Sequence, residues 1–381
     1  MRRRDFLKLG MLGTTGAILG WDGLAGAAQK ASGPLPFPAP VYRTLGRTGL
    51  KITVVSFGAM LTPEPEVIRV AFEHGVNYVD TARRYMNGRN EEIVARALKG
   101  MHDKVYVATK IISSSRSKED IVRDVETSLK ALERDHIDVI QLHNVTGRER
   151  LFEPEMREAL VKLRQQGKVR FFGVTTHTNE TEVVNAIVDD KDKFFDTILV
   201  KYNFKSGDDL KKAIARAAQA GIGVIAMKTQ AGGYTTDALG PISPHQAALK
   251  WALQDKSITA AIPGMRDMGH LRENIAVMGM RMTIADSLIL RTYGAAVASR
   301  YCHMCGKCEE TCPKGVAISV INRSLMYAEA YRSAELARDT YGEIPSSASA
   351  AACTECGHCT ARCVNGLDVA AKMARARQLL T

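Results

Sequence analysis

Short runs of β-branched and apolar residues alternate with amphipathic stretches through residues 41–280 of the chain. Between Asp120 and Leu132, for instance, apolar residues recur at helical spacing. The pattern predicts eight strands, each followed by a helix, and this rhythm is typical of a (β/α)8 TIM barrel of the α/β class. The predicted strands lie at 54–59, 77–80, 104–109, 138–142, 169–174, 196–201, 222–227 and 258–262.

A doubly wound parallel sheet is the alternative fold for such an alternation. That fold normally carries a glycine fingerprint between its first strand and first helix. The string from Gly221 to Ala226 matches G-x-G-x-x-A, but it precedes a strand instead of opening a helix. We interpret it as the end of a helix and a turn, and the barrel remains the preferred fold.

Titratable side chains stand where the predicted strands end. Asp80 ends the second strand, Lys110 closes the third, His143 follows the fourth, and Tyr85 lies in the loop after Asp80. Each has an ordinary explanation alone, as a helix cap, a solvated lysine or a loop side chain. The loops that follow barrel strands meet at one mouth, however, where active sites form. Four titratable groups there predict a catalytic site.

The chemistry of the four residues is consistent with carbonyl reduction. A carbonyl that receives hydride develops negative charge on oxygen and needs a proton donor. A tyrosine such as Tyr85 holds its proton tightly, and a neighbouring ammonium from Lys110 is expected to lower its pKa. Asp80 would keep the lysine charged and oriented, and His143 would position the carbonyl oxygen.

Three segments resemble the active-site motifs of the aldo-keto reductases: YVDTARRY (78–85), VATK (107–110) and QLHN (141–144). The stretch 42–58 is also similar to the hairpin that plugs the bottom of that family's barrel, and to its first strand. The resemblance implies that Tyr85 is the general acid, that Asp80 and Lys110 tune it, and that His143 orients the carbonyl. It also implies a small carbonyl or alcohol substrate and NAD(P)H as the hydride donor.

The positions that would contact the nicotinamide depart from the family's pattern. Met227 stands near the position of the usual stacking aromatic residue, and Leu199 near that of the usual glutamine. Lys228 is as readily interpreted as a surface lysine. The choice between NAD and NADP stays open. The residues that the resemblance assigns to the dinucleotide are Thr175, Thr176, Lys228, Arg266, Glu273 and Asn274.

All eight cysteines fall in two runs near the C-terminus that repeat one spacing, C-x2-C-x2-C-x3-C. Three thiolates on one tight loop fit one 4Fe–4S cubane, and the fourth cysteine of such a run ligates the other cluster. The spacing therefore predicts two 4Fe–4S clusters with crossed ligands. Cys302, Cys305, Cys308 and Cys363 would hold one, and Cys353, Cys356, Cys359 and Cys312 the other.

Zinc is the competing interpretation, because C-x2-C pairs also build tetrahedral sites. Zinc gives no reason for a third cysteine at the same interval, and a c-type haem would need a histidine directly after C-x-x-C. The segment resembles bacterial-type ferredoxin domains, with a helical connection at 322–340. It departs from them at Val364, where a proline usually follows the last cysteine.

The pattern of residues at the N-terminus predicts an export signal. Arg3 and Arg4 open a twin-arginine pattern, a mildly apolar stretch follows, and Ala25–Ala27 offers a small-residue cleavage site. We expect a twin-arginine signal peptide at 1–27, export to the periplasm of a bacterium, and a proline-rich linker at 28–40. The remaining domains would be an aldo-keto reductase barrel at 41–282 and a mainly helical two-cluster ferredoxin-like domain at 283–381.

Composition restricts the partners. The chain of 381 residues has a formal net charge of +11, which falls to +9 without residues 1–27. Two clusters with four thiolates each would lower it to about +5. Such a modest excess favours a one-electron redox partner that is acidic or membrane-associated. We expect no nucleic-acid partner, because no basic run is interleaved with aromatic residues.

These features together predict an iron–sulfur oxidoreductase of aldo-keto reductase type that interconverts a carbonyl and an alcohol. The electrons would reach the substrate through NAD(P)H or from the clusters without it. The alternative is an electron-transfer or assembly subunit whose barrel has lost catalysis, since a fold does not imply a function.

Overall fold

The computed structural model describes residues 37–236, 239, 243–356 and 358–381. The predicted signal peptide and residues 28–36 of the predicted linker lie outside these residues. Parallel strands follow one another around a sheet in sequence order, as a (β/α)8 barrel requires. They are β3 (Phe57–Gly58), β4 (Tyr78–Asp80), β5 (Tyr106–Ile111), β6 (Ile137–Leu142), β7 (Val169–Thr176), β8 (Thr197–Lys201), β9 (Gly223–Met227) and β10 (Ala260–Ala261).

The first and last strands close the sheet into a barrel. The amide of Ser56 donates to the carbonyl of Ala261 at 2.9 Å, and parallel bridges join Val55 to Ala261 and Gly58 to Gly264. All eight predicted strands are confirmed. The first and last are shorter than predicted, since isolated bridges and not a continuous ladder connect them.

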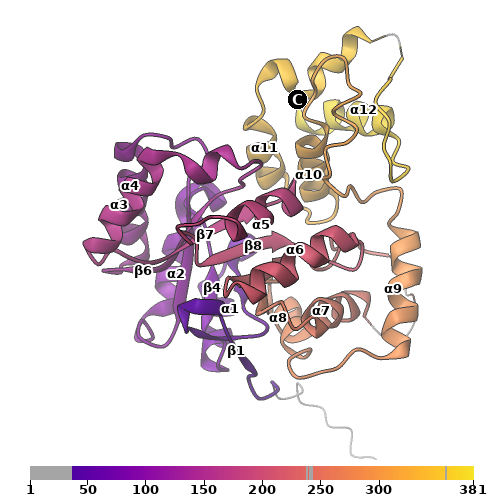
Figure 1. Ribbon diagram of the computed structural model, residues 1–381. Coiled ribbons are helices and arrows are strands. Elements are labelled where there is room, and N and C mark those ends of the chain that lie inside the picture. The colour runs from indigo at the N-terminus through magenta and orange to yellow at the C-terminus, as the bar shows by residue number, and fades with distance from the viewer. Residues whose placement is uncertain (1–36, 237–238, 240–242, 357) are drawn as a thin grey trace, which may run out of the picture. The chain divides into compact units, whose positions relative to one another are not determined.

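Helices surround the barrel and continue beyond it toward the C-terminus (Figure 1). The helices that alternate with the strands are α1 (Pro65–Glu73), α2 (Arg89–Leu98), α3 (Lys118–Leu132), α4 (Pro154–Gln165), α5 (Glu180–Val188), α6 (Asp208–Gln219), α7 (Pro244–Gln254) and α8 (Met268–Ile275). Those that follow are α9 (Ile284–Ala296), α10 (Ile318–Glu329), α11 (Ala334–Gly342) and α12 (Val369–Leu380).

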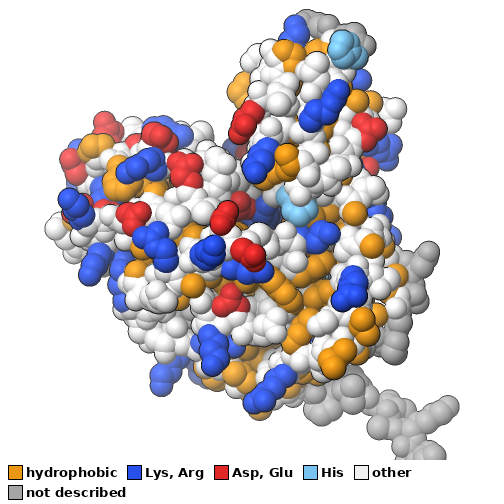
Figure 2. All heavy atoms as spheres, turned by 45° about the vertical axis from the view of Figure 1, so that its right-hand side comes forward, with side chains coloured by type: hydrophobic (Ala, Val, Ile, Leu, Met, Phe, Trp, Pro, Cys, Tyr) orange, Lys and Arg blue, Asp and Glu red, His pale blue; other side chains and the backbone are white. Residues whose placement is uncertain are grey.

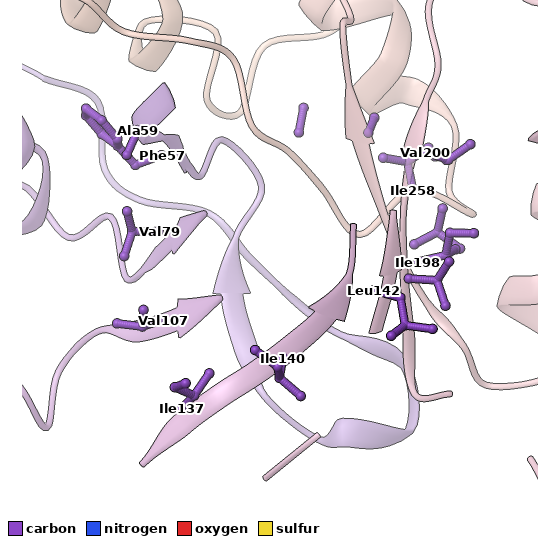
Figure 3. Close-up of a cluster of buried hydrophobic side chains, with 14 of the residues drawn as sticks. Phe57, Ala59, Val79, Val107, Ile137, Ile140, Leu142, Ile198, Val200 and Ile258 are labelled. Atoms are coloured by element: carbon purple, nitrogen blue, oxygen red, sulfur yellow. The ribbon is translucent and has the colours of Figure 1, made fainter. Parts of the chain in front are cut away.

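Alternation along each strand separates two apolar layers. Val79, Val107 and Ile198 face outward and pack in the core between the strands and the helices (Figure 3). Their strand neighbours Tyr78 and Leu199 belong to a second cluster inside the barrel. The same period of two brings Asp80, two residues after Tyr78, to the inner face at the carboxyl end of β4.

The opposite end of the barrel is closed by a hairpin of β1 (Tyr42–Thr44) and β2 (Lys51–Thr53). Leu45 inserts so closely that a Cβ at Gly223 would lie 2.5 Å from Leu45 Cδ1, so only glycine fits there. The plug predicted at the barrel bottom is confirmed, and the cavity opens at the other end.

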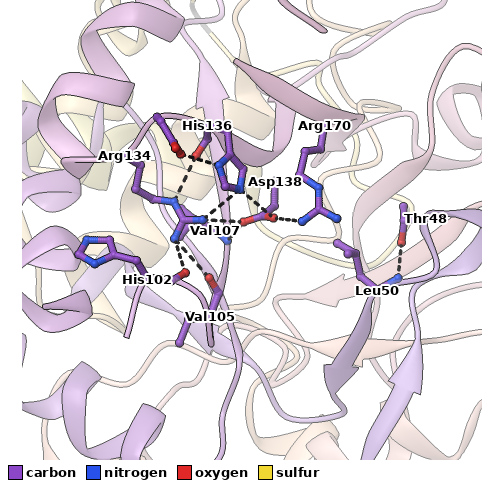
Figure 4. A network of polar contacts seen from close by, with 10 residues as sticks. Thr48, Leu50, His102, Val105, Val107, Arg134, His136, Asp138 and Arg170 are labelled. Carbon is purple, nitrogen blue, oxygen red and sulfur yellow. Dashed lines mark hydrogen bonds and ion pairs between the residues drawn. The ribbon is translucent and has the colours of Figure 1, made fainter. Parts of the chain in front are cut away.

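A buried carboxylate stabilises the region near the start of β6 (Figure 4). Asp138 accepts from Arg170 Nη1 at 2.7 Å, from Arg134 Nη2 at 3.3 Å and from the amide of Val107 at 2.9 Å. The site lies at the amino-terminal end of the strands, where buried networks serve stability and not catalysis.

The chain after the barrel is helical, as predicted. Thr283 and Asp286 form a reciprocal capping box at the start of α9. The connection predicted as helical at 322–340 is two helices, α10 and α11, separated by a bend at Arg332, which has a positive φ of 50°.

The side of the molecule that carries α9 shows hydrophobic side chains grouped at its surface (Figure 2), and those of Ile284 and Leu288 are exposed. Within the described ranges, no helix has the length and apolar character needed to span a bilayer.

Candidate functional site

A polar layer caps the barrel interior at the carboxyl end of the strands. The ammonium of Lys110 donates to Asp80 Oδ1 and, at 2.6 Å, to the carbonyl of Thr81. Gln141 Nε2 donates to the other carboxylate oxygen of Asp80 at 2.7 Å. These side chains are almost fully buried, and β4, β5 and β6 place them on adjacent strands. The pair that the sequence predicted is therefore formed.

The loop after β4 delivers Tyr85 to this layer. It is a short 3-10 segment (Tyr85–Gly88) in which Met86 and Asn87 have positive φ angles of 51° and 54°. Such angles are strained for these residues and concentrate at functional sites. Arg83 fastens the loop by an ion pair with Glu91, a carboxylate that is completely buried and also accepts from Thr109 at 2.6 Å.

Tyr85 and His143 face each other edge to face, with ring centroids 6.0 Å apart. The Lys110 ammonium lies 4.8 Å from the centre of the Tyr85 ring, below its face. All four predicted residues thus come together, three of them lining one cavity with Lys110 beneath it.

The electrostatics of Tyr85 differ from the prediction. Burial, and then Asp80, raise the pKa of the Tyr85 phenol well above its usual value. The ammonium of Lys110 donates to Asp80 and Thr81 and lies over the face of the ring, and the pKa of Tyr85 is raised despite this nearby cation. Burial, and then Lys110, lower the pKa of His143 well below its usual value. At neutral pH the phenol is protonated and the imidazole is neutral.

The cavity at the barrel mouth has a volume of about 590 Å³, within the range of small-molecule sites. One wall comes from the barrel and includes Asp80, Tyr85 and His143. The other comes from α10 and α11, with Arg323 and Tyr327 among its residues. The cysteine-containing part of the chain therefore completes the site instead of being a separate appendage.

Polar contacts tie α11 to the Tyr85 loop. Asn87 Nδ2 donates to Glu335 Oε1 at 2.9 Å, and Arg84 Nε lies 3.5 Å from Glu343 Oε1. Arg89 Nη2 lies 3.7 Å from Glu335 Oε1. The position of Tyr85 thus depends on both parts of the chain.

Three of the residues assigned to the dinucleotide line the cavity: Lys228, Arg266 and Glu273. Two of them are held by α10 and the turn after it. Lys228 Nζ lies 2.9 Å from the Tyr327 hydroxyl and 5.0 Å from the centre of the Tyr331 ring, and Arg266 donates to the carbonyl of Tyr331.

The other three, Thr175, Thr176 and Asn274, are buried and do not line the cavity. Thr175 Oγ1 accepts from the amide of Asn144 at 2.8 Å, and Thr176 Oγ1 donates to Thr178 O at 2.7 Å. Asn274 accepts from Gln230 at 3.0 Å. Because these partners occupy their polar groups, they contribute to local structure at the rim.

Sequence reasoning missed two cavity residues. His177 directly follows β7, so the rule that polar groups gather at strand ends points to it as it did to His143. Arg323 lies on α10, 180 positions after His143 in the chain. No local pattern marks Arg323, because only tertiary packing brings α10 over the mouth.

The first set of cysteine thiols is grouped as predicted. Burial, with smaller contributions from the neighbouring thiols of Cys305 and Cys363, raises the pKa of Cys302 to about 11. Burial raises the pKa of Cys308 to about 12, with Cys302, Cys363 and Cys305 among the neighbours that contribute. Cys363 comes from the other run, so thiols of both runs lie near one another here, as crossed ligands would require.

The second set surrounds a cavity of about 270 Å³. Its lining includes Cys312, Cys353, Cys356 and Cys359. Burial raises the pKa of Cys353, and Cys312 has the next largest effect. Four thiols around an open space fit a polynuclear iron–sulfur core, which would displace their protons on binding. In the part of the chain that is described, no group of three or more His, Cys, Asp or Glu is arranged to hold a single metal ion.

Two matches to protein-family models fit this architecture. Residues 63–241 match the aldo/keto reductase family, and residues 301–367 match the 4Fe–4S dicluster domain. The second match favours iron–sulfur clusters over the zinc alternative.

Individual relatives agree with the first match. L-galactose dehydrogenase of Arabidopsis thaliana is 26% identical over 62% of this chain and 87% of its own length. The uncharacterized oxidoreductase YrpG of Bacillus subtilis is 26% identical over 66% of this chain and 94% of its own length.

Solved structures show the same fold. An aldo-keto reductase of Bacillus halodurans in its holo form has a TM-score of 0.56 at 23% identity, over 66% of this chain and 96% of that one. One from Klebsiella pneumoniae in complex with NADPH also has a TM-score of 0.56, at 24% identity, over 66% of this chain and 95% of that one. The two family matches therefore give the chain an aldo/keto reductase domain at residues 63–241 followed by a 4Fe–4S dicluster domain at residues 301–367, and together they support its assignment as an iron–sulfur oxidoreductase.

Proposed function

We propose that the protein interconverts a carbonyl and an alcohol in the cavity at the barrel mouth, with Tyr85 as the general acid and with electrons passing through two 4Fe–4S clusters. One observation carries the proposal. The same cavity is lined by Asp80, Tyr85 and His143 of the barrel and by α10 of the cluster domain. A site built from both domains is what a reaction needs when one domain handles protons and the other electrons.

The roles of the residues follow from their protonation states. Reduction of a carbonyl consumes two electrons and two protons and leaves a C–H and an O–H bond. Tyr85 gives its proton to the developing alkoxide oxygen, for which it must be protonated, as its raised pKa ensures. His143 is neutral and donates a hydrogen bond to the same oxygen. The ion pair of Asp80 and Lys110 fixes the end of β4 beneath the cavity, because Lys110 also donates to the carbonyl of Thr81.

The order of the clusters is part of the proposal. Lys201, at the end of β8, donates to the carbonyl of His303, the neighbour of Cys302. This contact supports placing the cluster of Cys302 next to the barrel. Cys353, Cys356 and Cys359 line an open cavity of their own, which supports entry of electrons from a one-electron partner on that side.

Two kinds of electron supply are compatible with the site. NAD(P)H, when bound, supplies an electron pair and one hydrogen as hydride, whereas 4Fe–4S clusters supply single electrons. The NADPH complex of the related Klebsiella reductase supports the first supply. The contacts that α10 and Tyr331 make with Lys228 and Arg266 support the second, because these cations are already engaged.

The test uses protein purified without oxygen and loaded with iron and sulfide. Reduction of an aromatic aldehyde is measured with NADPH, NADH or reduced methyl viologen. Tyr85→Phe is expected to lose on the order of 10²-fold or more of the activity, as for removal of a general acid. Tyr42→Phe is the matched control, since Tyr42 lies on the hairpin at the closed end.

The donor that supports activity decides between the two electron supplies. Activity with methyl viologen alone removes the dinucleotide from the proposal. Unchanged activity in Tyr85→Phe would contradict catalysis in the barrel. The remaining interpretation would then be an electron-transfer or assembly subunit.

We also propose that the protein is exported by the twin-arginine route to the periplasm. The support is the pattern around Arg3 and Arg4, followed by an apolar stretch and small residues at 25–27. Replacement of both arginines by lysine is expected to keep the loaded protein in the cytoplasm, as measured by cell fractionation. Equal export of the variant would contradict this route.

A further inference from the structure

Arg323 is a buried cation that no carboxylate of the described residues neutralises. Its side chain lies on α10, the residue is 5% exposed, and Nη1 donates to Asn144 Oδ1 at 3.1 Å. Nε is buried without a hydrogen-bond partner among the described residues, and none of their carboxylates forms an ion pair with it. Burial of a guanidinium without a negatively charged partner costs folding free energy, and a bound anion would offset that cost.

His177 lies against the same cavity. It follows β7 directly, is 8% exposed, and has Nδ1 buried without a hydrogen-bond partner in the described part of the chain. Burial, and then Arg323, lower the pKa of His177 well below its usual value. The imidazole is therefore neutral, and in one tautomer it donates from Nδ1. Two unused donors of different residues thus lie in one cavity.

Three other cations that line the cavity already have partners. Arg84 lies 3.5 Å from Glu343, Lys228 contacts the Tyr327 hydroxyl, and Arg266 donates to the carbonyl of Tyr331. Arg323 donates to Asn144, the chain neighbour of His143, and lines the same cavity as Tyr85 and His143. An anionic group bound by Arg323 would therefore share the cavity with the reacting carbonyl.

We propose that Arg323 and His177 form a carboxylate subsite, so that the substrate is an oxo acid or hydroxy acid whose carboxylate is near the reacting carbon. This inference rests on the proposed function of the same cavity and names its substrate class. The guanidinium of Arg323 and the imidazole of His177 donate to the carboxylate, while Tyr85 and His143 contact the carbonyl oxygen. The cluster domain then supplies the residue that selects the substrate.

The test compares a charged and an uncharged ligand of similar shape, benzoylformate and its methyl ester. Their binding to the iron-loaded protein is measured by calorimetry without an electron donor, so no turnover is needed. The wild-type protein is expected to bind the acid at least tenfold more tightly than the ester. Arg323→Gln, which can still donate to Asn144, is expected to remove that preference, and His177→Leu to reduce it.

Arg332→Gln is the control, because it removes the same charge from an exposed position at the rim of the cavity and should change the preference less than twofold. Equal binding of acid and ester by the wild-type protein would overturn the proposal without any variant. So would an acid preference that survives Arg323→Gln. A loss of NADPH or NADH binding in Arg323→Gln with the acid preference intact would instead assign Arg323 to a phosphate.

Failure of this inference is separable from failure of the proposed function. Tyr85→Phe is expected to keep the preference for the acid, because Tyr85 acts on the carbonyl oxygen and not on the carboxylate. An intact acid preference together with unchanged activity of Tyr85→Phe would support the subsite and remove the catalytic role of Tyr85. Loss of activity in Tyr85→Phe, together with equal binding of acid and ester, would support the catalytic role of Tyr85 and remove the carboxylate subsite.

Discussion

Lys201 and Glu180 form an ion pair between the end of β8 and the start of α5, with Nζ and Oε1 2.7 Å apart. Both side chains are largely buried. Burial lowers the pKa of Lys201, but Glu180 and the other nearby negative groups outweigh it, so that the pKa is raised overall. The charged ammonium lies close enough to lower the pKa of Cys302, and it contacts the backbone one residue further on.

Lys201→Met is expected to make the cluster bound by Cys302 harder to reduce. Removal of the cation leaves Glu180 uncompensated near a cluster that gains negative charge on reduction. A charge interaction of about 1 kcal/mol corresponds to about 40 mV for one electron, so we expect a shift of tens of millivolts to lower potential. Redox titration followed by electron paramagnetic resonance measures it. Lys211→Met, at an exposed pair with Asp208, should leave the potential unchanged.

The crossed ligand sets predict which cluster each fourth cysteine supports. Cys363→Ser should alter the cluster of Cys302, Cys305 and Cys308, although Cys363 belongs to the other run in sequence. Cys312→Ser should alter the cluster at Cys353 instead. Iron content and the resonance spectra of the two variants distinguish the sets. Damage confined to the cluster of the mutated residue's own run would contradict the crossing.

The buried pair of Asp80 and Lys110 predicts a non-additive effect on stability. Lys110→Met leaves the Asp80 carboxylate buried without its cation, which costs about 3–5 kcal/mol in such sites. The double variant with Asp80→Asn should lose less than the sum of the single losses. Urea unfolding measures both. Lys168→Met breaks an exposed pair with Glu126 and should cost at most about 1 kcal/mol. Additive losses would contradict coupling of the pair.

The buried histidines predict loss of stability in acid. The folded-state pKa values of His143 and His177 lie well below 6.5. The unfolded chain therefore takes up protons that the folded chain does not as the pH falls below about 6.5. Each histidine should lower the free energy of unfolding by about 1.4 kcal/mol at pH 5.5, and the full stability is present above that range.

Urea unfolding between pH 7.5 and 5.5 measures this dependence. His177→Gln should lose less unfolding free energy than the wild-type protein over this pH range, by about 1.4 kcal/mol, because glutamine does not titrate. His74→Gln, at an exposed position on the far side of the barrel, is the control for a general effect of replacing histidine. An unchanged slope in His177→Gln would show that the imidazole titrates alike in the folded and the unfolded chain, which would contradict its lowered pKa.

The sequence revealed the barrel because each strand alternates between an inner and an outer face, and that period survives in every strand. It also placed Asp80, Tyr85, Lys110 and His143 together, since parallel strands deliver their ends to one mouth. The cysteine sets followed from spacing alone. These features are local or repeat along the chain.

What the sequence did not reveal depends on contacts between distant segments. The Tyr85 pKa rises chiefly because the phenol is buried, and the cavity that Tyr85 lines is completed by α10, which the VATK and YVDTARRY motifs do not contain. Arg323 belongs to a helix whose pattern is ordinary. Thr175 bonds to the loop after β6 and Thr176 to the loop that follows its own strand, and motif comparison does not detect these contacts.

The position of α10 makes iron supply a condition for substrate recognition as well as for electron flow. The helix lies between the two cysteine runs in sequence, and its packing shares a core with residues of both loops. We therefore expect loss of the clusters to loosen the packing of α10 and, with it, one wall of the substrate cavity. Iron content would then affect the binding of substrate as well as the supply of electrons.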